Sequence, residues 1–158
     1  MSESLTSLDA VEMARLVATR ELSPVELVQA HLDRIDAVND GLNAIVAPAA
    51  DALDRARDAE RAVNSRSSLG PLHGVPYTIK DSIDVAGFPT TSGSLLTSRT
   101  PAATDAPVVA RIRAAGGVLL GKTNTPEFTL WWETDNRVFG RTNNPWNTER
   151  TTGGSSGG

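Results

Sequence analysis

The sequence has no cysteine, only two histidines and no long apolar run, and each shortage excludes a class of protein. Without cysteine the chain cannot hold a disulfide scaffold, a thiol nucleophile or a thiolate metal site. His31 and His73 lie in unrelated contexts, and neither has a metal-binding spacing. No apolar segment approaches the roughly 20 residues that cross a bilayer. Any chemistry must therefore depend on Lys, Ser, Asp, Glu or backbone groups.

Basic stretches are also absent. The formal net charge is −4 and the pI is near 5.1, whereas a nucleic-acid binder normally has a positive footprint. The N-terminus lacks the basic and apolar segments of a signal peptide. Hydrophobic residues make up 39% of the chain, which is ordinary for a globular protein. We expect a cytoplasmic, soluble protein that binds neither nucleic acid nor membrane, and homo-oligomer formation stays open.

Residues 1–65 predict a helical segment with three helices. The first is expected to begin after Ser7 as its cap. The second begins at Ser23–Glu26, where a capping serine, a proline and a glutamate follow the order of a capping box, and Gly41 is placed to end it. The third, about 49–64, is charged and has the pattern of a solvated, exposed helix. The apolar positions of the first two helices are Leu8, Val11, Leu16, Val17, Leu27, Val28, Leu32, Ile35 and Val38.

Residues 66–158 alternate between strand and helix signals. Val75–Lys80 alternates apolar and other residues as a strand does, and its proline demands an edge, a strand start or a bulge. A helix is expected from Asp105 to Ala115, followed by a buried strand at Val118–Lys122 and mostly loop from Asn124. The predicted fold class is α/β, with N-terminal helices followed by part of a mixed sheet flanked by helices.

Gly116–Thr123 matches the phosphate-loop pattern G-x-x-x-x-G-K-[ST]. That loop must follow a buried strand and open a helix. Here the preceding residues have a helical pattern, and Val118–Leu120 resemble the strand itself. The glycines are therefore expected to end a helix and turn the chain into a strand.

Lys80 is a second candidate because it ends a mostly apolar strand, where α/β sheets commonly place ligands. A desolvated lysine has a lowered pKa and can act as a base or nucleophile. The alternative is a lysine that reaches into water or pairs with Asp81. From this segment alone the alternative is favoured, because buried lysine is rare.

The run Gly153–Gly158 has two interpretations. Its composition is that of a flexible linker or a cloning scar. Glycine-rich turns with hydroxyls also let the backbone approach a substrate and aim N–H groups at developing negative charge. Composition does not decide between the two.

Taken together, these segments resemble the amidase signature family in order and spacing, from about residue 70 onward. The resemblance makes the phosphate-loop match a coincidence and removes most of the linker interpretation. The segments that carry it are Leu72–Pro76, Ile79–Asp81, Thr90–Ser94, Asp105–Ala106, Ala115–Gly116, Leu120–Asn124, Glu127–Phe128, Asn136, Phe139–Gly140, Asn144–Trp146 and Gly153–Gly158.

In that family a lysine, a serine after a cis peptide bond and a second serine form the catalytic set. Lys80 matches the lysine and Ser155 matches the cis-serine. The resemblance implies an unprotonated Lys80 acting as base through Ser155, with Ser156 as a supporting hydroxyl. Gly153 and Gly154 are expected to tolerate the dihedrals that the turn needs. The implied activity is hydrolysis of a small-molecule amide through an acyl-serine intermediate, with no metal and no organic cofactor.

The family's nucleophilic serine lies beyond this run, in a second glycine-rich segment that also supplies oxyanion N–H groups. The sequence ends at Gly158, so the 158 residues are expected to be one truncated N-terminal part of an amidase domain, inactive alone. An unfinished hydrophobic edge is expected, which is an aggregation hazard.

Two alternatives remain for the whole protein. One is a non-catalytic fragment or a piece that needs a partner chain. The other is the amidase subunit of a tRNA-dependent amidotransferase, which hands ammonia to another subunit. Trp131 and Trp132 are candidates for a hydrophobic acyl channel or for packing in a core or interface.

Overall fold

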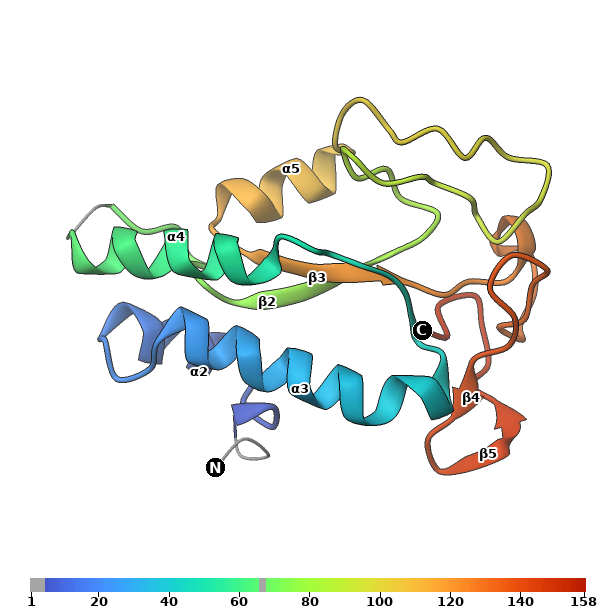
Figure 1. Cartoon of the computed structure of the whole chain (residues 1–158), viewed down its shortest axis with the longest axis horizontal. Coiled ribbons are helices and arrows are strands. Elements are labelled where there is room, and N and C mark those ends of the chain that lie inside the picture. The colour runs from blue at the N-terminus through green and yellow to red at the C-terminus, as the bar shows by residue number, and fades with distance from the viewer. Residues whose placement is uncertain (1–4, 66–67) are drawn as a thin grey trace. The chain divides into compact units, whose positions relative to one another are not determined.

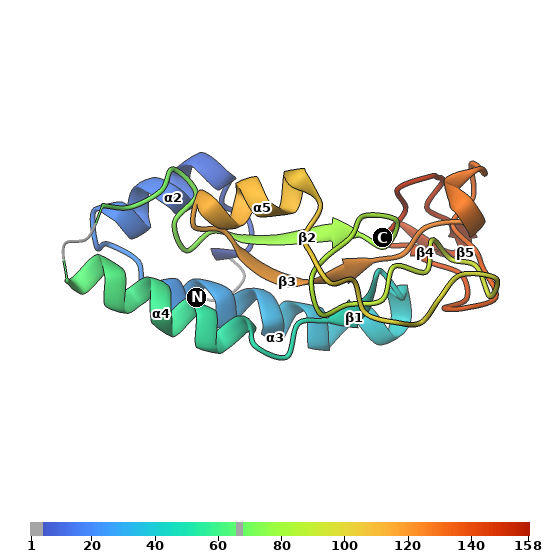
Figure 2. The same ribbon diagram turned by 90° about the horizontal axis from the view of Figure 1, so that it is seen from above.

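The computed structural model describes residues 5–65 and 68–158, and its elements are drawn in Figures 1 and 2. The chain divides into two compact units. The first comprises Met1–Asp36, Ala49–Tyr77 and Ala110–Leu120, and the second Ala37–Pro48, Thr78–Val109 and Gly121–Gly158. Helices and a small mixed sheet make up the structure, which confirms the predicted α/β class.

Helix α2 (Ala10–Ala18) begins later than the sequence predicts. Its cap is Asp9, whose carboxylate accepts a 2.8 Å hydrogen bond from the Glu12 N–H, so the prediction of Ser7 as cap is wrong. An aspartate satisfies a free helix N–H as well as a serine does and also complements the helix dipole. The buried face is likewise shifted, because Val11 is 80% exposed while Met13 is buried.

Helix α3 (Pro24–Leu42) confirms the predicted start. Ser23 Oγ accepts hydrogen bonds from the N–H groups of the second and third helical residues, at 3.1 and 3.3 Å. The predicted stop at Gly41 is wrong, because Gly41 lies inside the helix. The chain leaves the helix at Asn43, which takes the left-handed conformation at φ 55° that asparagine tolerates better than most residues.

Helix α4 (Ala52–Asn64) starts three residues after the expected position, because the chain first forms strand β1 (Ile45–Pro48). No signal in the sequence predicts β1, since four residues between two helices show no period. The charged face of α4 was predicted, and its other face buries three alanines and Val63 at helical spacing.

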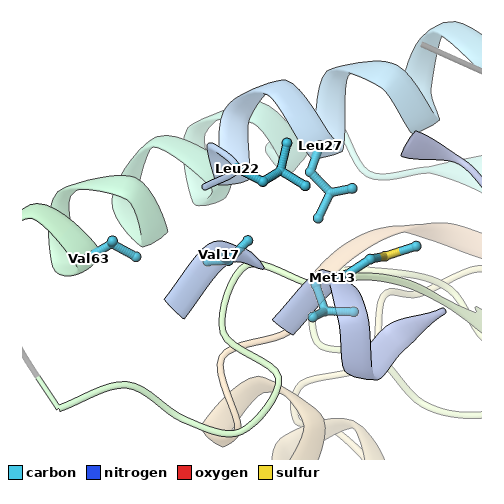
Figure 3. Packing of buried hydrophobic residues seen from close by; sticks show 6 residues of the cluster. Met13, Val17, Leu22, Leu27 and Val63 are labelled. Atoms are coloured by element: carbon cyan, nitrogen blue, oxygen red, sulfur yellow. The ribbon is translucent and has the colours of Figure 1, made fainter. Parts of the chain in front are cut away.

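The first unit has a cluster of buried side chains from α2, α3, α4 and the start of the following strand. Figure 3 shows five of them converging on one point. Fully burying such a side chain contributes about 1.5–3 kcal/mol, so this cluster holds the helices of the unit together. Its buried members are Met13, Val17, Leu22, Leu27, Val63 and Val75.

The three-stranded sheet has the order β1–β3–β2, with β2 at Pro76–Lys80 and β3 at Val118–Thr123. Every residue of β3 is buried, as expected for the central strand. Pro76 opens an edge strand, which is where a residue without an N–H donor is tolerated. Helix α5 (Pro107–Ala114) precedes β3, close to its predicted bounds.

Strand β1 runs antiparallel to β3. The β2–β3 pair runs in one direction, because hydrogen bonds join Val118 to Val75 at one end and Asp81 to Thr123 at the other. The sheet is therefore mixed, as predicted, and β2 ends in the second unit at Lys80.

The last part of the chain is less irregular than predicted. Strands β4 (Asn143–Asn144) and β5 (Asn147–Thr151) form an antiparallel hairpin in the second unit, near the C-terminal end in Figure 1. A short 3₁₀ turn, η1, covers Glu127–Thr129. The polar, asparagine-rich sequence lacks the apolar alternation that would have predicted these strands. Within residues 5–65 and 68–158, no helix combines the length and apolarity that crossing a membrane requires.

Candidate active site

Lys80 is the last residue of β2, and its side chain is partly buried. Its Nζ lies 3.0 Å from Ser155 Oγ and 3.1 Å from Ser156 Oγ. The structure therefore brings together the lysine and both serines that the family resemblance singles out. The alternative pairing of Lys80 with Asp81 is wrong, because the Asp81 carboxylate contacts Lys122 and Thr91 instead.

Burial lowers the pKa of Lys80 from its ordinary value. Removing water disfavours the charged ammonium, and the two contacting hydroxyls carry no charge that would restore it. A lysine without its extra proton has a lone pair on Nζ. At 3.0 Å from a hydroxyl, that lone pair can accept a proton, which is the geometry of a general base.

The glycine-rich run is anchored to the second unit at three points. The peptide bond between Gly154 and Ser155 is cis. The Thr134 hydroxyl donates to the Gly153 carbonyl at 2.6 Å, and the Thr125 hydroxyl donates to the Ser155 carbonyl at 3.2 Å. The N–H of the last residue donates to the Asn124 carbonyl at 3.3 Å. A flexible linker has no such fixed contacts, so the linker interpretation is wrong.

A buried amide network lies beneath this run. The Asn136 side-chain amide donates to Asn124 Oδ1 at 2.8 Å and to the Thr125 carbonyl at 2.7 Å. Asn124 in turn donates to the Thr142 hydroxyl at 2.9 Å. Both asparagines belong to the segments that resemble the family, but sequence reasoning assigned them no role. Their contacts show that they fix the residue whose hydroxyl reaches Ser155.

Asp81 and Lys122 form a buried ion pair with 3.4 Å between Nζ and Oδ1. Their side chains are 1% and 0% exposed. Lys122 is the lysine of the phosphate-loop pattern, and it lies in β3 with its ammonium turned into the protein. The segment is a strand and not a loop, which confirms that the match is a coincidence. Sequence reasoning did not predict the pair.

Trp131 and Trp132 stack on each other with ring centroids 4.8 Å apart. They are 55% and 72% exposed, so packing in the core of this chain is wrong for both. Their two other proposed roles, in an acyl channel or an interface, stay predictions.

The histidines take no part in this site. His73 Nε2 lies 2.9 Å from the Ala59 carbonyl, and His31 Nδ1 lies 2.9 Å from the Leu27 carbonyl of its own helix. In the part of the chain that the structure describes, no three His, Cys, Asp or Glu side chains gather in a way that could hold a metal ion.

The family model for amidases matches residues 26–158, which is most of the chain and includes all of the residues at this site. The chain belongs to the amidase signature family. Curated relatives of this amidase include a glutamyl-tRNA(Gln) amidotransferase subunit of Salinispora tropica and an acylamidase of Rhodococcus erythropolis. Each is 47% identical over 98% of this chain and 32% of its own length.

A solved structure of a bacterial aryl acylamidase of the amidase signature family is similar with a TM-score of 0.86. It is 35% identical, and the match covers 95% of this chain and 32% of that one. The chain thus spans about a third of the length of the relatives it matches. The comparisons support an amidohydrolase of this family and leave its substrate open.

Proposed function

We propose that the protein containing this chain cleaves carboxamide C–N bonds through an acyl-serine intermediate, with Lys80 as base and Ser155 as proton relay. The observation that carries this proposal is the 3.0 Å contact between Lys80 Nζ and Ser155 Oγ. Family membership supports the reaction class, and the lowered pKa of Lys80 supports its role as base.

The proposed proton path has three members. Ser155 Oγ accepts the proton of the nucleophilic serine while its own proton passes to Lys80 Nζ. The nucleophile's oxygen then bonds to the amide carbon, and the proton returns along the same path to the departing amine nitrogen. Water later hydrolyses the acyl-serine, with the same groups handling its proton. Ser156 would hold Lys80 from a second side, at 3.1 Å.

Gly153 and Gly154 would shape the turn that presents Ser155. Gly153 has φ 90°, a left-handed conformation that glycine adopts at little cost. We propose no cofactor or metal for these steps, because each one moves only a proton or an acyl group between the named atoms.

The family's nucleophilic serine has no match within residues 1–158. We therefore propose that this chain by itself, as the N-terminal part of one amidase domain, does not turn over amides. The acidic composition and the N-terminal sequence favour a cytoplasmic enzyme with a small-molecule amide as substrate.

A second candidate is the amidase subunit of a tRNA-dependent amidotransferase. It is favoured by the 47% identity to the glutamyl-tRNA(Gln) amidotransferase subunit of Salinispora tropica. The same identity to an acylamidase means that similarity alone does not separate the two functions. Glutaminase activity that appears only with co-purifying subunits would decide for the amidotransferase, whereas hydrolysis of simple amides by the isolated protein would decide against it.

The relay role can be tested by replacing Ser155 with alanine in the protein expressed from the complete coding sequence. We expect kcat to fall about 100- to 10,000-fold, the range that acid–base groups contribute. Ser98→Ala is the control, because Ser98 is exposed and bonds only a neighbouring N–H among the contacts described. Full activity of Ser155→Ala, measured as amine release, would refute the relay.

A further inference from the structure

The chain contains thirteen arginines but only two lysines, Lys80 and Lys122. Neither lysine is on the open surface. Lys80 ends the edge strand β2, and Lys122 lies in the neighbouring strand β3 with no exposed side-chain area. The proposed mechanism uses only Lys80. A fully buried second ammonium next to the catalytic strand therefore needs its own explanation.

Lys122 is surrounded by acceptors that belong to the segment following Lys80. Its Nζ donates to the Asp81 carbonyl at 3.0 Å, to the Pro89 carbonyl at 2.8 Å and to Thr90 Oγ1 at 3.1 Å. These three acceptors match the three N–H donors of an ammonium group. Lys122 thus ties β3 to the loop that leaves the active-site strand.

Asp81 is fixed from the opposite side. Its Oδ2 accepts from the Thr91 hydroxyl at 2.6 Å and from the Thr91 N–H at 3.2 Å, while Oδ1 faces Lys122 at 3.4 Å. The carboxylate therefore has three partners, and Lys80 is not among them.

The peptide group between Lys80 and Asp81 is held at both of its polar atoms. The Asp81 N–H donates to the Thr123 carbonyl at 2.9 Å, and the Lys80 carbonyl accepts from the Ile83 N–H at 3.0 Å. Neighbouring residues of an extended chain project to opposite sides. With Asp81 locked to one side, Lys80 is aimed to the other, where Ser155 lies.

We propose that Asp81 and Lys122 are positioning residues, which hold the end of β2 so that Lys80 Nζ meets Ser155 and keep the adjacent carboxylate occupied. This inference rests on the proposed role of Lys80 as base. Neither residue of the pair touches the substrate in this mechanism, and both act through Lys80.

The charged groups described around this strand end are Lys80, Asp81, Asp84 and Lys122. Asp81 and the exposed Asp84 both favour the charged form of Lys122 and oppose the effect of its burial on its pKa. If Lys122 lost its charge, the Asp81 carboxylate would stand beside Lys80 without a counter-ion. It would then favour the ammonium form of Lys80, which cannot act as a base.

The experiment compares single and double variants in the protein expressed from the complete coding sequence. Asp81→Asn or Lys122→Met alone leaves one buried charge unpaired and is expected to destabilise the fold. Asp81→Asn combined with Lys122→Met removes both charges and should unfold at a temperature closer to that of the wild type. We nevertheless expect its kcat to remain at least tenfold low, with KM within about threefold, because Lys80 is no longer aimed.

A matched control separates positioning from plain stability. Val109 is fully buried in α5 and belongs to the same unit, so Val109→Ala destabilises by opening a cavity. Its kcat at a temperature where the protein stays folded should equal the wild-type value. If the double variant also recovers wild-type kcat, the pair only stabilises the fold and the proposal is wrong.

A second readout does not need activity. Competitive acetylation over a pH series reports the fraction of each lysine that is unprotonated. Lys80 and Lys122 lie in different tryptic peptides, since Arg99 and other arginines separate them, so mass spectrometry reads each one alone. In the double variant Lys80 should react only at higher pH than in the wild type. An unchanged pH dependence would overturn the proposal.

The two hypotheses fail in different ways. If Lys80→Met keeps full amidase activity, the proposed function of Lys80 is wrong, whatever the pair does. If Lys80→Met is inactive while the double variant matches the wild type in kcat and in Lys80 acetylation, the base stands and only the positioning role is refuted.

Discussion

Lys80 shows how a residue with an ordinary sequence context acquires chemistry from a distant segment. Its two hydroxyl partners lie 75 and 76 residues later in the chain. Nothing in the strand sequence predicts them, so the local pattern favoured a lysine facing water. The family resemblance identified both partners because it compares ordered segments and not single ones.

The lowered pKa of Lys80 has a consequence for the pH dependence of the enzyme. A base works in its unprotonated form, so activity should rise with pH through the pKa of Lys80 and then level off. Because burial lowers that pKa, the plateau should be reached below the ordinary lysine value of about 10.4. The measurement is kcat/KM against pH for an uncharged amide. A rate that still climbs steeply at the ordinary lysine pKa would contradict this expectation.

At the scale of elements, the sequence predicted what depends on local chemistry. The start of α3 at Ser23 and the strand at Pro76–Lys80 were confirmed because capping and alternation act within a few residues. Asp9, Asn43 and the strands β1, β4 and β5 were missed or misplaced. The caps have near-equivalent neighbours in sequence, and the short strands form only through pairing with distant partners.

Two glycines predict opposite effects of the same substitution. Gly116 has φ 91°, and an added Cβ would lie 2.8 Å from His73 Cα, whereas Gly41 is helical with nothing within 4 Å. Gly116→Ala should therefore lower the free energy of unfolding by more than about 1 kcal/mol, since it meets both strain and a clash. Gly41→Ala should raise it by up to about 1 kcal/mol through helix propensity.

Chemical denaturation of the two glycine variants checks these values. The pair is internally controlled, because the added methyl group is the same in both. Equal effects, or a stabilising Gly116→Ala, would show that the turn between α5 and β3 does not require a left-handed residue. That turn is also the part of the phosphate-loop pattern that its glycines explain.

At the scale of the whole molecule, the exposed apolar side chains are the least ordinary feature. Phe128, Leu130, Trp131 and Trp132 lie within one short segment of the second unit and are between 42% and 80% exposed. Large apolar side chains gathered in this way mark an interaction surface or an aggregation hazard. The sequence-based expectation of exposed apolar surface is consistent with this segment.

We therefore expect the 158-residue chain to self-associate as its concentration rises. Replacing Trp131 and Trp132 with serine should shift it toward monomer in sedimentation velocity. Trp146→Ser is the matched control, because Trp146 is 95% exposed but stands alone in the β4–β5 hairpin. Association that is unchanged in the double tryptophan variant would show that this segment is not the contact.

The central claim is that Lys80 is the base of an amidase. The most direct test is kcat/KM for amide hydrolysis by the Lys80→Met variant of the protein expressed from the complete coding sequence, beside Arg137→Met as an exposed cation control. Methionine keeps the apolar stem but has no amine, so we predict a loss of about 100- to 10,000-fold for Lys80→Met and none for the control. A Lys80→Met enzyme within about twofold of the wild type would contradict the claim, since a general base contributes far more than that.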